Sequence, residues 1–60
     1  EFDFNRALAG CAGDTRERME AQRSRYQELQ KRMEAGEGTI ALVAQMREIL
    51  AEARALAGQG

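Results

Sequence analysis

The sequence predicts an all-α fold, an antiparallel helical hairpin, on three observations. The sixty residues contain no proline, and helix-favouring Ala, Glu, Gln, Arg and Met are abundant. Between glycine clusters at 10–13 and 36–38, apolar residues recur at helical spacing. The two predicted helices are joined by only two or three residues, and connections that short join antiparallel neighbours. We therefore expect a helix over about 14–35, a turn at 36–38 and a helix over about 39–57, which together form a hairpin domain over 14–58.

The ends of both helices carry recognisable signals. Asp14 is a candidate N-cap, and Glu17 stands three residues later as in a capping box. Gly36 suits the left-handed position that ends the first helix. Thr39 is a candidate N-cap for the second helix, which we expect to fray at Gly58.

The N-terminal stretch, 1–13, is predicted to be either a disordered tail or a short helix. A helix there would be capped by Asp3 and would place Phe2, Phe4 and Leu8 on roughly one face. A tail is the alternative, because short isolated helices are marginal in water. Residues 1–2 also match what a common cloning junction encodes.

The first long helix offers a narrow apolar seam. Met19, Tyr26 and Met33 are spaced by seven residues, and Leu29 occupies the complementary position. Seven residues before Leu29, the equivalent seam position is occupied by Gln22, so one position of this otherwise apolar seam is polar and we call it the polar defect.

Arginines border this seam and are expected to set charge specificity. One column is Arg18, Arg25 and Arg32, and the other is Arg16 and Arg23. Two parallel copies of this helix would place arginine near arginine, which is repulsive. Glu48 and Glu52 are candidates to face Arg25 or Arg18 across the hairpin; alternatively the arginines meet acidic groups on a partner or are simply solvated.

The second helix carries a wide apolar stripe, which we expect to form the interface with another chain. Its first column follows a 4-3-4-3 rhythm, and a second column runs beside it, so the first helix covers the first column and leaves much of Val43 and Leu50 exposed. The predicted interface consists of Leu42, Val43, Met46, Ile49, Leu50, Ala53 and Leu56, with Tyr26 and Leu29 from the first helix.

The small size of the chain also favours a second chain. A domain of sixty residues has a marginal core and usually needs further stabilisation by disulfides, a bound metal or a second subunit. Cys11 is the only cysteine, so a disulfide framework is excluded. With one thiol and no histidine, a zinc site of four Cys/His ligands is not expected. We expect a homodimer, such as a four-helix bundle, or a hetero-complex. The single cysteine fits a reducing, cytoplasmic setting.

The residues needed for catalysis are missing. Without histidine the commonest general base is absent, Cys11 has no imidazole partner, and Ser24 has no base nearby. Glu48 and Glu52 lie one turn apart, a spacing more typical of a solvated face than of a cation site. We therefore predict no enzyme activity, no catalytic or metal-binding residue and no cofactor. No apolar run approaches the ~20 residues of a membrane span.

A protein–protein interaction module is the function this pattern favours, and two alternatives stay open. A helix ending at Met33-Glu34-Ala35-Gly36, followed by apolar rhythm from Leu42 to Leu56, is similar in format to the helical-hairpin co-chaperones of type III secretion needle subunits. It is similar at the same level to the paired-helix docking segments of modular polyketide synthases. The first resemblance implies a small chaperone or adaptor that shields a helical client. The arginine columns suggest an RNA-binding bundle, but interleaved acids and a net charge of −1 disfavour nucleic acid.

Overall fold

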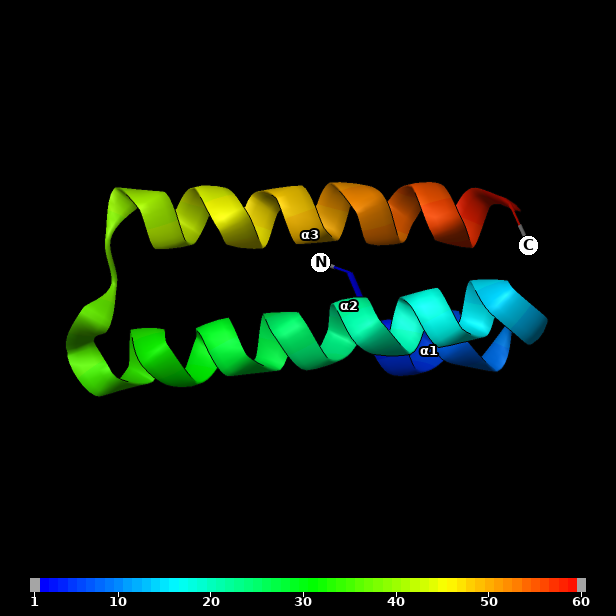
Figure 1. Cartoon of the computed structure of the whole chain (residues 1–60), viewed down its shortest axis with the longest axis horizontal. Coiled ribbons are helices and arrows are strands. Elements are labelled where there is room, and N and C mark those ends of the chain that lie inside the picture. The colour runs from blue at the N-terminus through cyan, green and yellow to red at the C-terminus, as the bar shows by residue number, and fades with distance from the viewer. Residues whose placement is uncertain (1, 60) are drawn as a thin grey trace.

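The computed structural model describes residues 2–59, and within that range every regular element is helical (Figure 1). The order is α1 (Phe4–Ala9), α2 (Gly13–Arg32), η1 (Met33–Glu37) and α3 (Ile40–Gln59). Helices α2 and α3 run side by side in opposite directions, with η1 joining them at one end. The predicted all-α class is confirmed. Glu1, half of the suspected cloning junction, lies outside the described residues.

The turn between α2 and α3 is built from the two residues that the sequence singled out. Gly36 has φ 89° and ψ 10°, the left-handed conformation that glycine adopts without the steric penalty of a Cβ atom. Thr39 caps α3: its hydroxyl accepts a hydrogen bond from the Leu42 amide at 3.1 Å, and its carbonyl accepts from the Val43 amide at 3.1 Å. Both local predictions are confirmed.

Two predicted helix ends are wrong. Helix α2 begins at Gly13, with Ala12 in the N-cap position and no side-chain cap bond, so Asp14 lies in the first turn instead of capping it. The chain reverses between α1 and α2 through Gly13, whose φ is 62°, and that reversal sets the start of α2. Helix α3 continues through Gly58 to Gln59. A glycine inside a helix costs only ~0.5–1 kcal/mol relative to alanine, so it does not end a helix by itself.

The N-terminal stretch has the helical form of the two alternatives. The Asp3 carboxylate accepts hydrogen bonds from the backbone amides of Asn5 at 3.0 Å and Arg6 at 3.3 Å, which caps α1. One face of α1 buries Phe4 and Leu8. Because an isolated helix of this length is marginal, the burial of these two side chains is what holds it in place.

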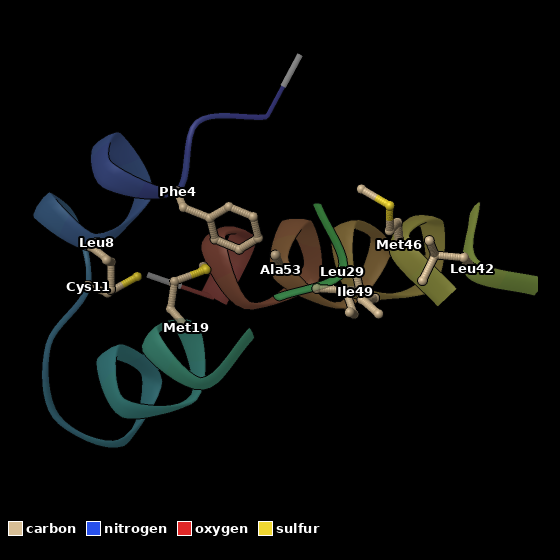
Figure 2. Packing of buried hydrophobic residues seen from close by; sticks show 9 residues of the cluster. All are labelled: Phe4, Leu8, Cys11, Met19, Leu29, Leu42, Met46, Ile49 and Ala53. Atoms are coloured by element: carbon tan, nitrogen blue, oxygen red, sulfur yellow. The ribbon is translucent and has the colours of Figure 1, made fainter. Parts of the chain in front are cut away.

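The core runs lengthwise through the molecule and draws on all three α-helices. Figure 2 shows two groups of side chains with Ala53 between them. At the end where α1 packs on α2 lie Phe4, Leu8, Cys11 and Met19; toward the turn lie Leu29, Leu42, Met46 and Ile49.

Candidate protein–protein interface

Most of the predicted interface belongs to the chain's own core. Five of the nine predicted residues are buried within the chain: Leu29, Leu42, Met46, Ile49 and Ala53. They form the seam between α2 and α3, as expected for the first column of the stripe. A second chain therefore reaches α3 only through the positions beside this seam.

The N-terminal segment covers part of the second column. The Phe4 ring lies 5.5 Å from that of Tyr26, and the Phe2 ring packs edge-on against Phe4 at 4.9 Å. Leu50 is half-buried beside them, and these four side chains line one open groove. The expectation that much of Leu50 is exposed is therefore corrected, because α1 and the residue pair before it occupy the space that we assigned to another chain.

Leu56 lies at the opposite margin of the stripe. It is half-buried and lines a shallow groove with Arg18, Gln22 and Glu52. Nothing from α1 lines this groove, so it remains open to solvent on the side of the hairpin away from the N-terminal aromatics.

Three large apolar side chains remain exposed at the turn end of the hairpin, and we call them the turn-end patch. Ile40 is 91% exposed, Met33 38% and Val43 36%. They line one hollow, and Ala44 and Arg47 complete its α3 side. Burying a fully exposed side chain of this size stabilises a complex by ~1.5–3 kcal/mol, which applies to Ile40. Met33 and Val43 keep only a little over a third of their surface in water and would add less.

Of the turn-end patch, only Val43 is among the interface residues predicted from the sequence. Met33 was assigned to the seam of the first helix and Ile40 to no surface at all. Ile40 is the first residue of α3, directly after the Thr39 cap, and lies outside the 4-3-4-3 rhythm of the buried column. The available signal was the absence of any charged residue from Gly38 to Met46, which leaves no charged side chain to shield an apolar one there.

One arginine column is engaged within the chain. Arg16 donates to the Glu20 carboxylate at 3.2 Å, one helical turn away. Arg23 donates to the Asn5 side-chain carbonyl of α1 at 3.1 Å and helps to hold α1 on α2. Both side chains of the Arg16 pair are about half exposed, so the pair contributes at most a few tenths of a kcal/mol.

The other arginine column lines the open side of the α2–α3 boundary. Arg25 and Arg32 line one groove with Glu48 and Glu52. Within residues 2–59 these side chains form no ion pair with one another, and the ion pair found there is Arg16–Glu20. The Glu52 carboxylate instead accepts a 2.6 Å hydrogen bond from the side-chain amide of Gln22. Gln22, the polar defect of the seam, thus links the two helices.

The described residues offer little to other kinds of site. No group of three or more Cys, Asp or Glu side chains within 2–59 is arranged to hold a metal ion. None of the helices in that range combines the length and apolarity needed to cross a bilayer. Comparisons with family models, with curated proteins and with solved structures find no match to this chain. The turn-end patch is therefore the feature from which a function has to be inferred.

Proposed function

We propose that the chain is a non-enzymatic protein–protein interaction module that packs the turn-end patch, and the adjoining edge of α3, against another protein chain. The observation that carries this proposal is the exposure of Ile40, 91% of whose surface is in water although the residue sits in a folded helix. Single exposed apolar residues are ordinary, but here Met33 and Val43 adjoin it.

The composition of the two long helices supports the same proposal. Helix α2 has ten charged residues in its twenty, whereas α3 has four, namely Arg47, Glu48, Glu52 and Arg54. A helix that only α2 and α1 cover is expected to carry a charged outer face. Helix α3 instead exposes Ile40 and Val43 beside the small side chains of Ala41 and Ala44 at its turn end, and its first charged residue is Arg47.

The arginines favour a protein partner over nucleic acid. Phosphate binding requires a basic surface that acidic side chains do not interrupt. Here Arg25 and Arg32 share their groove with Glu48 and Glu52. The net charge is −1. We expect no gel shift with RNA hairpins even at low salt.

The test compares two variants that add the same charge to α3. Ile40→Glu places a carboxylate in the turn-end patch, and at the first turn of α3 it also suits the helix dipole, so the fold is retained. Ala51→Glu is the matched control at an exposed position outside the patch. Association is measured by sedimentation of the purified chain and by cross-linking to candidate protein partners, with far-UV circular dichroism to verify folding.

The proposal expects Ile40→Glu to abolish association that wild type and Ala51→Glu retain. It is abandoned if wild type neither self-associates nor binds any protein in an Ile40-dependent way.

A further inference from the structure

We propose that the occupant of the turn-end patch is a second copy of this chain, packed antiparallel across a two-fold axis that passes near Val43. This inference rests on the proposed function and adds the identity and orientation of the partner. It follows from the order in which charged and apolar residues are arranged along the turn end.

The charges flank the turn-end patch asymmetrically. On the turn side, η1 contributes the exposed carboxylates Glu34 and Glu37. On the other side, Arg47 lines the same hollow as the patch, one helical turn beyond Val43. No lysine or arginine occurs from Met33 to Met46. Starting from the turn and moving along the hairpin, this surface is therefore first acidic, then apolar and then basic.

Such an order is complementary to itself when one copy is reversed. A two-fold axis perpendicular to α3 sets the acidic turn of each copy against Arg47 of the other and brings the two patches together. A parallel arrangement would instead align acid with acid and arginine with arginine, which is repulsive. Within this surface, opposite charges meet only in the antiparallel pair.

Two further features suit a second copy. The net charge of −1 leaves little long-range repulsion between identical chains. Ala44, exposed in the same hollow, allows a second helix to approach closely. The patch is small beside the ~800 Å² per partner of a standard stable interface, so the dimer is weak and forms in a concentration-dependent way.

The experiment is charge reversal followed by sedimentation equilibrium from about 10 µM to about 1 mM, a range that spans weak affinities. Arg47→Glu is expected to weaken self-association at least ~10-fold, because like charges then face each other twice in the dimer. A variant combining Glu34→Arg with Glu37→Arg should weaken it similarly. Arg54→Glu changes the net charge as Arg47→Glu does but lies in the groove with Phe2, and it should leave association unchanged.

Mixing the two weakened variants provides the decisive step. In a mixed pair, glutamate at 47 of one chain meets arginines at 34 and 37 of the other, and Arg47 meets the native carboxylates at the second contact. Equimolar mixing should therefore restore the wild-type affinity, which neither variant has alone.

The outcomes separate this inference from the proposed function. Dimerisation that is lost on reversal and recovered on mixing supports the antiparallel pair. A dimer indifferent to both reversals overturns it. A chain that stays monomeric while binding a different protein through Ile40 overturns self-pairing and leaves the interaction module intact. A chain with no Ile40-dependent association of any kind overturns both.

Discussion

The two ends of this hairpin are built from the same pair of helices but differ in how far their apolar side chains are covered. At the end away from the turn, α1 packs on α2, and the aromatic residues Phe2 and Phe4 line a groove with the half-buried Leu50 of α3. At the turn end, Met33, Ile40 and Val43 have no such cover among residues 2–59. The difference shows what a short added segment achieves: six helical residues are enough to close one side of a two-helix core at that end. The open end is the one to which we assign a partner.

The largest effect is expected from reopening the closed end. Phe4→Ala removes a buried ring that contacts both Phe2 and Tyr26, and should lower the free energy of unfolding by about 3–5 kcal/mol. It should also release α1 and expose Leu50, which a hydrophobic dye such as ANS detects. Urea denaturation followed by circular dichroism measures the loss.

Phe2→Ala is the matched control for this first prediction. Phe2 is only half-buried and sits outside α1, so its loss should cost less than half as much. Equal losses for the two variants would mean that α1 is not what closes this end.

The closed end is also where sequence reasoning was least complete. The helical periodicity of 42–56 identified the column that packs on α2, because residues at that spacing face one neighbour whatever else is present. It did not reveal that α1 covers Leu50. Whether a short helix forms at all depends on the tertiary burial of Phe4 and Leu8, which local pattern does not contain.

Charged contacts were predicted less well than apolar ones, for a related reason. Arg25 and Glu48 line one groove without forming an ion pair, and the bond across this boundary joins the side chains of Gln22 and Glu52. Long exposed side chains have many near-equivalent positions, and each contact is worth little, so spacing alone does not select among them. The turn was predictable because ending the first helix there needs a residue in the left-handed conformation, and Gly36 adopts it.

At the turn end, the next largest effect is expected at Gly36. Gly36→Ala forces a side chain into a left-handed conformation at φ 89° and should cost about 1–2 kcal/mol, although a Cβ atom there would meet no neighbour. Thermal unfolding measures the loss. Gly58→Ala is the control, since Gly58 has no positive φ and open space around it; that change should be neutral or stabilising by up to ~1 kcal/mol. A Gly36→Ala variant as stable as wild type would contradict the left-handed turn.

A smaller loss is expected at the cap that presents Ile40 to solvent. Thr39→Ala removes the hydroxyl that accepts from the Leu42 amide and should cost about 1 kcal/mol. Thr39→Ser keeps the hydroxyl and should retain most of the stability, as measured by the shift in melting temperature. If serine and alanine destabilise equally, the cap bond does not stabilise α3.

The smallest effect on the isolated fold is expected within the turn-end patch itself, and this sharpens the contrast between the ends. Ile40→Gln should change the free energy of unfolding by less than ~0.5 kcal/mol in dilute solution, because Ile40 is 91% exposed. At high concentration the two proteins should diverge: the melting temperature of wild type rises as pairing stabilises the folded chain, and that of Ile40→Gln stays constant. Stability that depends on Ile40 even at high dilution would place this side chain in the chain's own core and would remove the distinction between a closed end and an open one.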